Sequence, residues 1–303
     1  MTKQRREAKM PRPANSLTSM EHLVDILDLE RIEENLFRGD SPDVGWQRLF
    51  GGLVIAQALA ATQRTAPTDR FVHSLHAYFL RPGDPAIPVV YEVDRIRDGG
   101  SFTTRRAIAI QHGKPIFSLS ASFQSDEDGF AHQIPIPDIT PPEDLPDSDT
   151  IYEKFLRDAP EHIRNFWMRE RPVEIRPVSM THYISSDRLE PSQHVWVKAN
   201  GRVPEDRRTA AAVLAYVSDM TLLDTALFPH GLSVFDRTLQ AASLDHAMWF
   251  HSDPDFSDWL LYTQDSPFSG GGRGLSRGAI YTRSGRLIAS VAQEGLIRKR
   301  ATD

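Results

Sequence analysis

Two stretches of the chain are apolar on every side of the helix that they predict, and no other feature constrains the fold as much. The first spans residues 51–60, with Gln57 as its only polar side chain, and the second spans residues 209–223. A helix that is apolar all round must be surrounded by other structure, because no face of it suits water. The sequence therefore predicts two buried helices, each enclosed by its own set of neighbouring elements.

Runs of alternating apolar and polar residues follow each predicted helix, and turn residues such as Gly99-Gly100 and Gly113 separate the first set. We expect strands at residues 71–80, 87–96, 102–110, 115–124, 244–250, 259–264, 278–282 and 286–293. A buried helix followed by several antiparallel strands is an α+β unit. The pattern predicts two such units in one chain.

The two sets of strands also share sequence. His76–Leu80 (HAYFL) aligns with His246–Phe250 (HAMWF) at a separation of 170 residues, and residues 107–118 align with 278–290 at 172. Two matches in the same order at nearly the same separation indicate an internal duplication. The alternative is a pair of unrelated α+β domains. In this alignment of the two copies, Ser243 corresponds to His73 and Gln293 corresponds to Ala121.

The composition divides the chain into four parts. We expect a disordered basic arm at 1–18, a first unit at 19–130, a proline-rich linker with a connecting helix at 131–170, and a second unit at 171–300. Five prolines between residues 134 and 149 indicate an extended linker, and residues 150–167 have a helical pattern.

Several classes of function are disfavoured by composition. The chain contains no Cys, so disulfides, thiolate metal sites and a cysteine nucleophile are excluded. The net charge of -6 argues against a nucleic-acid partner. No stretch reaches the roughly 18–20 apolar residues of a membrane span. We expect a cytoplasmic protein without a metal or cofactor, since the histidines show no metal-ligand spacing.

Three polar features are candidates for chemistry. Asp219 lies on the apolar second helix, where burial of a carboxylate is costly unless it is hydrogen-bonded or useful; a solvent-facing Asp near a helix end is the alternative. Gln293 lies in a predicted strand, either facing a site or as a hydrogen-bonded core amide. Residues 269–274 (SGGGRG) lack the Lys-Ser/Thr of a P-loop and predict a flexible loop, with Arg273 and Arg277 as candidate phosphate ligands.

Seven stretches in this order together resemble the acyl-CoA thioesterase II family. They are RLFGGLVIAQAL (48–59), VHSLHAYFLRPGD (72–84), IRDGGSF (96–102), GKPIFSLSASFQ (113–124), LDHAMWFH (244–251), WLLY (259–262) and VAQEG (291–295). The resemblance runs from about residue 20 to residue 298, apart from the linker. It implies a double hotdog fold, in which two fused units each wrap a long helix in an antiparallel sheet. It also implies hydrolysis of medium- to long-chain acyl-CoA and a homo-oligomer, dimeric or tetrameric.

By its motifs, the resemblance assigns water activation to Asp219, Ser243 and Gln293, with Ser where relatives can carry Thr. Further candidate substrate-binding residues are Gly51, Gly52, Gln57, His73, His246, Trp249, Arg273 and Arg277. Candidates for an apolar acyl tunnel are Leu53, Ile55, Phe79, Phe117, Met248 and Trp249, and Arg105 and Arg106 join the candidates for the CoA phosphates. Two alternatives stay open at this point: a dehydratase on the same fold, and a non-catalytic acyl-CoA binding protein.

Overall fold

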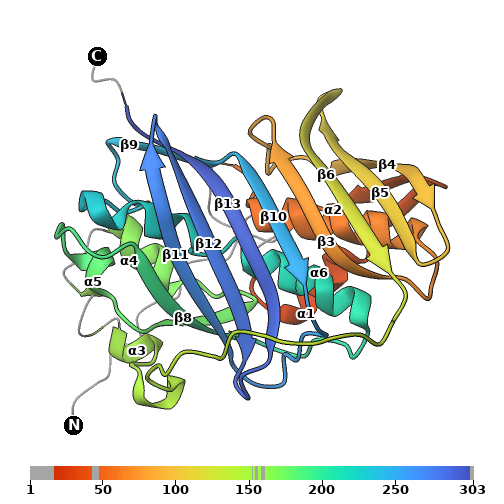
Figure 1. The fold of residues 1–303 in the computed structure, drawn as a ribbon. Coiled ribbons are helices and arrows are strands. Elements are labelled where there is room, and N and C mark those ends of the chain that lie inside the picture. Colours follow the sequence, from red (N-terminus) through yellow and green to blue (C-terminus); the bar gives the residue numbers. More distant parts are fainter. Residues whose placement is uncertain (1–16, 43–47, 152, 154–155, 158–160, 301–303) are drawn as a thin grey trace, which may run out of the picture.

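The computed structural model describes residues 17–42, 48–151, 153, 156–157 and 161–300 (Figure 1). Residues 1–16 of the predicted basic arm lie outside these ranges. The strands of the first half are β1 (Glu30–Glu33), β2 (Leu36–Gly39), β3 (Phe71–Phe79), β4 (Val89–Asp98), β5 (Phe102–Gln111) and β6 (Lys114–Gln124). The strands of the second half are β7 (Val173–Pro177), β8 (Ser192–Ala199), β9 (Leu239–Ser243), β10 (Asp245–Phe250), β11 (Leu260–Gly270), β12 (Arg273–Thr282) and β13 (Leu287–Lys299).

Both halves contribute to one antiparallel sheet of 13 strands, in the order β1-β2-β4-β5-β6-β3-β10-β13-β12-β11-β8-β7, with β9 paired to β13. The order on one side of the β3–β10 junction mirrors the order on the other. At the junction Leu75 pairs with Met248 and Ala77 with His246. The two predicted α+β units are thus present and are joined edge to edge, with β3 and β10 protecting each other's exposed edge.

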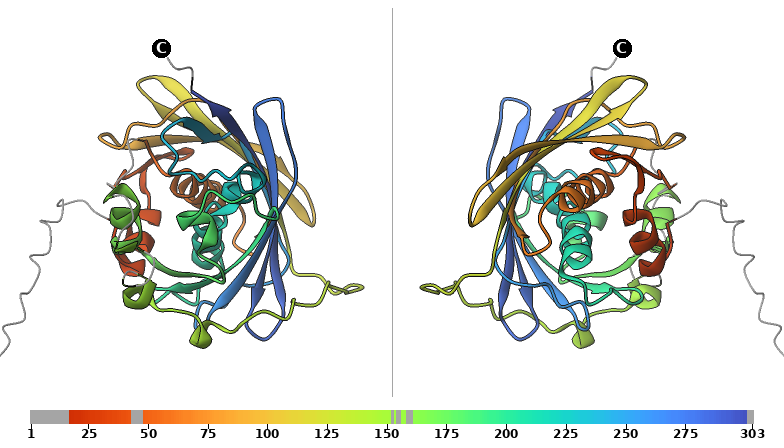
Figure 2. Two further views of the ribbon diagram at one scale, coloured as in Figure 1. Left: turned by 90° about the vertical axis from the view of Figure 1, so that its left-hand side faces the viewer. Right: turned by 90° about the vertical axis from the view of Figure 1, so that its right-hand side faces the viewer.

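The helices are α1 (Met20–Leu27), α2 (Gly51–Thr65), α3 (Ser148–Ile151), α4 (Glu161–Met168), α5 (Thr181–Ile184) and α6 (Arg207–Ser218), with short 3₁₀ turns η1 (Pro142–Asp144), η3 (Leu222–Ala226) and η4 (Phe228–His230). Helices α2 and α6 are the two predicted all-apolar helices. The sheet curves around them on one side, and α1 with the connecting helices closes the other (Figure 2).

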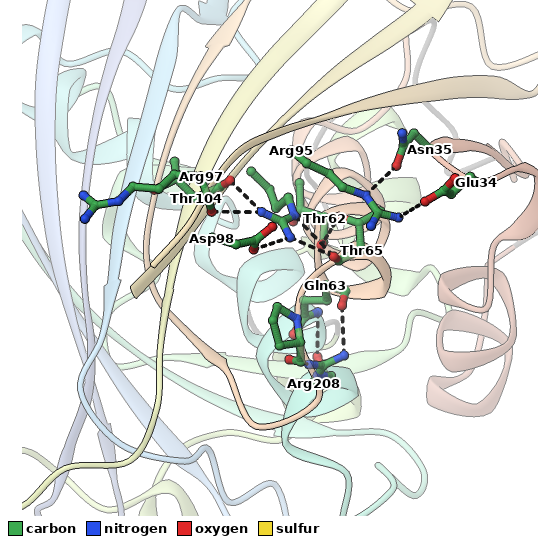
Figure 3. A network of polar contacts seen from close by, with 12 residues as sticks. Glu34, Asn35, Thr62, Gln63, Thr65, Arg95, Arg97, Asp98, Thr104 and Arg208 are labelled. Carbon is green, nitrogen blue, oxygen red and sulfur yellow. Dashed lines mark hydrogen bonds and ion pairs between the residues drawn. The ribbon is translucent and has the colours of Figure 1, made fainter. Parts of the chain in front are cut away.

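Helices α2 and α6 pack against each other in opposite directions. The Nε2 of Gln63, near the end of α2, donates to the Arg208 carbonyl at the start of α6, and the Arg208 guanidinium donates to the Gln63 carbonyl (Figure 3). One continuous apolar core includes Ile55 and Leu59 of α2, Leu214 of α6 and Met248 of β10. Because the two helices are antiparallel, the end of α6 lies at the start of α2.

The strand ladders correct the predicted alignment of the two copies. His76 is exposed on the outer face of the sheet, whereas His246 is fully buried on the inner face. Tyr91 and Tyr262, 171 residues apart, are both fully buried. A shift of one residue reverses the face of every side chain, so the true separation in these strands is 171. Ser243 therefore corresponds to Val72 rather than to His73, while Gln293 still corresponds to Ala121.

Other predicted boundaries also change. The second buried helix ends at Ser218 instead of Leu223, and the chain turns at Thr221, whose φ is 60°. Residues 269–274 are not a flexible loop. They close the β11–β12 hairpin, in which Gly271 and Gly272 form a two-residue turn with φ of 58° and 76°. Strands β1, β2, β7, β8 and β9 were not predicted.

The proline-rich segment after β6 runs along the outer face of the second half. Ile136, Ile139 and Leu145 pack against an aromatic cluster that contains Trp196 and Trp259, and the Trp196 indole donates to the Thr140 carbonyl at 2.9 Å. One helical stretch, residues 207–230, is long and apolar enough to cross a membrane by composition, but 83% of its apolar window is buried inside the fold. That burial is typical of a core helix.

Candidate active site

Asp219 caps the end of α6, and its position is set by a rigid turn. The Tyr262 hydroxyl donates to the Ser218 carbonyl at 2.6 Å. Beyond Asp219, Gln264 Nε2 donates to the Met220 carbonyl, and Gln193 Nε2 donates to the Thr221 carbonyl at 2.8 Å. A left-handed Thr costs conformational energy, and these buried amides hold it in place. The carboxylate is thereby presented at one defined point.

That point is the N-terminus of α2. A Cβ atom on Gly51 would lie 2.7 Å from Asp219 Oδ2, so only glycine allows this approach. The Gly52 N–H lies close enough to the Asp219 carboxylate to lower its pKa. Phe50, the N-cap residue of α2, provides no side-chain cap. A carboxylate supplied by α6 therefore caps α2 and lies in the favourable field at a helix N-terminus.

The pKa of Asp219 is shifted towards neutral pH. Burial raises its pKa to about 7, and hydrogen bonds from Gln293, Gly52 and Ser243 act in the opposite direction. The residue keeps part of its surface accessible to solvent, but its Oδ1 is buried and has no hydrogen-bond partner among the described residues. A carboxylate with a pKa near neutrality and a free oxygen suits a general base.

Ser243 and Gln293 meet beside this carboxylate at the junction of β9 with β13. Gln293 Nε2 donates to Ser243 Oγ at 2.9 Å. On its other side, Gln293 Oε1 lies 2.5 Å from His246 Nδ1, and His246 Nε2 lies 2.9 Å from Ser218 Oγ. The structure thus brings together the three residues predicted to activate water and adds two buried polar residues behind them.

The inner surface next to this group is apolar and aromatic. The Phe79 ring would lie 2.9 Å from a Cβ on Gly51 and packs on Phe117 with ring centroids 5.0 Å apart. Of the predicted tunnel residues, Leu53, Ile55, Phe117 and Met248 are fully buried core side chains. Phe79 is only partly buried and adjoins Asp219, which makes it the best placed of them to contact an acyl chain.

Three residues predicted to bind substrate lie elsewhere, and a fourth, His246, is buried behind Gln293. Gln57 is buried in the first half, where its amide bonds the Ile26 and Asp40 carbonyls and the Tyr91 hydroxyl. His73 bonds Ser122 at 2.8 Å and lines a cavity of about 220 Å³ with Gln63, Phe250 and His251, near the opposite end of the two helices. Trp249 points outward against His76, and His246 is too deeply buried to meet substrate.

The predicted cationic residues do not converge on Asp219 either. Arg273 pairs with Glu294 and Arg277 with Asp265, both at exposed positions. Arg106 pairs with Asp94 on the surface. Arg105 is 1% exposed, and its guanidinium is bonded to the Thr65 carbonyl and Asp98. These placements correct the expectation that Arg105 is available for a phosphate.

Sequence reasoning missed the residues that hold the site: Gln193, Ser218, Thr221 and Gln264. Polar side chains inside otherwise apolar strands were a usable signal for Gln264, whereas the left-handed Thr221 leaves no trace in the pattern. A cavity of about 230 Å³ beside the β11–β12 hairpin is lined by His230, Arg273 and Lys299 and does not include Asp219. No group of three or more His, Asp or Glu suited to a metal occurs within the described ranges.

Comparison with known proteins places the chain in a well-populated group. Residues 164–296 match the family model described as acyl-CoA thioesterase, and residues 37–124 match the model of the acyl-CoA thioesterase N-terminal domain. Acyl-CoA thioesterase 2 of Haemophilus influenzae is 40% identical over 92% of this chain and 98% of its own. Human acyl-coenzyme A thioesterase 8 is 42% identical over 90% of this chain and 88% of its own.

Solved structures agree in fold. The acyl-CoA thioesterase II TesB2 of Mycobacterium marinum aligns with a TM-score of 0.76 at 41% identity, covering 92% of this chain and 99% of that one. A hot dog fold protein of unknown function from Alicyclobacillus acidocaldarius aligns with a TM-score of 0.73 at 20% identity, covering 92% of this chain and 98% of its own. The predicted double hotdog architecture is confirmed.

Proposed function

Because this chain belongs to the acyl-CoA thioesterase family, we propose that it hydrolyses medium- to long-chain fatty acyl-CoA to a free fatty acid and CoA. The observation that carries the proposal is the convergence of Asp219, Ser243 and Gln293 at the N-terminus of α2. Each of the three comes from a different element, and the fold alone gives no reason for them to meet.

We propose that water is the nucleophile and that Asp219 is the general base. The Asp219 carboxylate, which keeps part of its surface accessible, accepts one proton of the water while the water oxygen forms a bond to the thioester carbonyl carbon. Ser243 and Gln293 orient the water through hydrogen bonds. Collapse of the tetrahedral intermediate breaks the C–S bond, and the proton returns from Asp219 to the leaving thiolate, so that a carboxylic acid and CoA thiol result.

The oxyanion that forms in this reaction needs preorganised hydrogen-bond donors. The start of α2 is the nearest source, because the first N–H groups of a helix have no partner within it and carry partial positive charge. The Gly52 N–H already binds Asp219. We propose that the Gly51 N–H stabilises the oxyanion. The small size of Gly51 allows both Asp219 and the substrate to approach.

The activity is tested by release of free thiol from acyl-CoA substrates of increasing chain length. We expect turnover to rise from short to medium and long chains, as apolar contact near Phe79 grows. Asp219→Asn should lower kcat by about 10²- to 10⁴-fold, which is the usual contribution of a general base. A near-normal kcat in this variant would exclude Asp219 as the base.

Asp224→Asn is the matched control. Burial also raises the pKa of Asp224 to about 7, and Asp224 lies five residues further along the chain. Its carboxylate accepts a hydrogen bond from the Tyr183 hydroxyl at 3.0 Å, and neither Gln293 nor Ser243 contributes to the shift of its pKa. We expect Asp224→Asn to retain kcat, since the amide can still accept that hydrogen bond.

The same assay separates the other functions. Absence of thiol release for every chain length, together with acyl-CoA binding, would favour a non-catalytic binding protein. Hydration of an enoyl-CoA without thiol release would favour a dehydratase. We further propose a cytoplasmic homo-oligomer, a dimer or tetramer, which light scattering of the purified protein and fractionation of cells would test.

A further inference from the structure

A chain of four polar side chains runs from the interior of the second half to the candidate active site. Ser218 Oγ lies 2.9 Å from His246 Nε2, His246 Nδ1 lies 2.5 Å from Gln293 Oε1, and Gln293 Nε2 lies 2.9 Å from Ser243 Oγ. His246 is 0% exposed. Burial lowers its pKa to about 4, against a smaller opposing effect of Gln293, so the imidazole is neutral near pH 7.

A neutral imidazole carries hydrogen on one nitrogen only, and the chain permits two directions. With hydrogen on Nδ1, His246 donates to Gln293 Oε1, and the Gln293 amide N–H₂ faces Ser243. The bare Nε2 then accepts from Ser218 Oγ, whose single hydrogen turns away from the Ala215 carbonyl that lies 2.8 Å from the same oxygen. With hydrogen on Nε2, His246 donates to Ser218 Oγ. In that case the Gln293 amide must turn round, because two acceptors cannot face each other at 2.5 Å. The amide oxygen would then face the active site.

Only the first direction suits the carboxylate. Hydrogen bonds donated by Gln293 and Ser243 both lower the pKa of Asp219. Gln293 can donate there only if its N–H₂ faces the site. Ser243 can donate its single hydrogen there only if it accepts from Gln293 instead of donating to it. A reversed amide would place an oxygen near the carboxylate and would use up the Ser243 hydrogen.

We propose that His246, as its Nδ1–H tautomer, is a positioning residue that fixes the orientation of the Gln293 amide and thereby aims the Ser243 and Gln293 hydrogens at the Asp219 carboxylate and its water. This inference rests on the proposed function and deepens it. His246 never contacts the substrate. It acts through Gln293, in the same way that a partner behind a catalytic group fixes its orientation.

The first half of the molecule shows that the fold does not need this chain. At the positions equivalent to Ser243, His246 and Gln293 it carries Val72, Leu75 and Ala121. All three are buried apolar side chains in the same curved sheet. Because apolar residues build the same architecture, the polar chain in the second half is better explained by chemistry than by stability.

The tautomer can be measured without any substrate. Protein labelled with ¹⁵N-histidine reports which ring nitrogen carries hydrogen, and the His246 signals are assigned as those missing from His246→Asn. We expect the Nδ1–H tautomer of a neutral ring across the pH range of activity. Observation of the Nε2–H tautomer would overturn the proposal.

Substitution then tests the function of the hydrogen bond. His246→Leu removes the donor at similar size and should lower kcat about 10- to 100-fold with KM little changed. His246→Asn can place an N–H near the former Nδ1 and should retain kcat within about threefold of wild type. His76→Leu, on the outer face of the neighbouring strand, is the matched control and should leave both constants unchanged.

A double-mutant cycle separates positioning from a general structural role. In a Gln293→Ala background, His246→Leu should cause no further loss of kcat, because the amide that His246 orients is absent. Additive losses, a change confined to KM, or equal losses for His246→Asn and His246→Leu would each overturn the proposal. If instead Asp219→Asn kept full activity, the proposed function would fail, while the tautomer measurement would still decide the state of His246.

Discussion

The two halves of the molecule wrap equivalent helices in equivalent strands, but the C-terminal ends of those helices carry side chains of opposite charge. At the end of α2, the buried Arg105 guanidinium donates to the Thr65 carbonyl at 2.9 Å and pairs with Asp98 at 2.6 Å. At the end of α6, the position equivalent to Arg105 is the small, fully buried Ser276, and an acid, Asp219, follows the helix.

The first arrangement is the one that helix electrostatics favours, since cations stabilise the C-terminal end of a helix and anions the N-terminal end. Asp219 is at the unfavourable end of α6, but the antiparallel packing places it at the favourable end of α2, where Gly52 binds it. In the comparison, the same scaffold has a cation at the C-terminal end of one helix and the proposed general base at the C-terminal end of the other. The difference is tested by five predictions.

Among exchanges between the two halves, the largest effect is expected when the second half is made to resemble the first. Gln293→Ala reproduces Ala121 and removes an orienting donor. We expect kcat to fall about 10²- to 10³-fold, the usual cost of losing one preorganised donor. The buried His246 also loses its partner, so the free energy of unfolding should fall by about 1–3 kcal/mol. Thiol-release kinetics measure the fall in kcat. A matched change in the first half, Ala121→Ser, should leave kcat unaltered, and equal losses from both variants would contradict the division of roles.

The reverse exchange concerns stability. Arg105→Ser reproduces Ser276 and leaves the Thr65 carbonyl and the surrounding buried groups without their donor. We expect the free energy of unfolding to fall by about 2–4 kcal/mol, as for other buried hydrogen-bonded groups, while kcat of the folded enzyme is retained. Urea denaturation measures the loss. Arg106→Ser, which removes an exposed ion pair, should cost less than about 1 kcal/mol.

The third prediction concerns the stability cost of Asp219. Its pKa is about 7 in the folded protein and near 3.8 when exposed, so the unfolded chain releases this proton first as the pH rises. The ionisation therefore lowers stability between pH 4 and 7, and the loss is constant above pH 7. We expect the free energy of unfolding of Asp219→Asn to exceed that of the wild type by about 1–3 kcal/mol above pH 7, and the two values to become equal near pH 4. Denaturation curves at several pH values measure it, and a difference that grows towards acid pH would contradict the assigned pKa.

The same ionisation predicts the pH dependence of catalysis. A general base must be unprotonated, so kcat/KM should rise about tenfold per pH unit below pH 7 and level off above it. Asp224→Asn should keep this profile. A flat profile between pH 5 and 8 would show that another group accepts the proton.

The smallest effect is expected on the outer face. Arg277→Ala removes an exposed pair with Asp265, and exposed pairs contribute about 0.2–1 kcal/mol at most. We expect stability and KM for acyl-CoA to change little. A rise of tenfold or more in KM would restore the prediction that Arg277 binds a CoA phosphate.

The sequence was sufficient for the architecture. Helices that are apolar on every side must be covered by other elements, and runs of alternating apolar and polar residues predict the strands that cover them. Both patterns follow directly from which side chains are buried. Asp219, Ser243 and Gln293 were reached through motifs that resemble a family, and the fold brings them together. The short edge strand β1 was missed because all four of its side chains are exposed. Strand β7 was missed although Val173–Pro177 alternates apolar and polar side chains, because an alternation of only five residues is a weak signal.

What only the tertiary structure decided is which residues face each other. The match of HAYFL with HAMWF in the sequence is displaced by one residue from the structural equivalence. Because a shift of one residue reverses the face of every side chain, the aligned His76 and His246 lie on opposite faces of the sheet, and Trp249 points outward against His76. A linear sequence also cannot show that the end of α6 meets the start of α2. The sequence determined that Asp219 would be costly to bury, and the antiparallel helix packing determined that a helix N-terminus would be there to receive it.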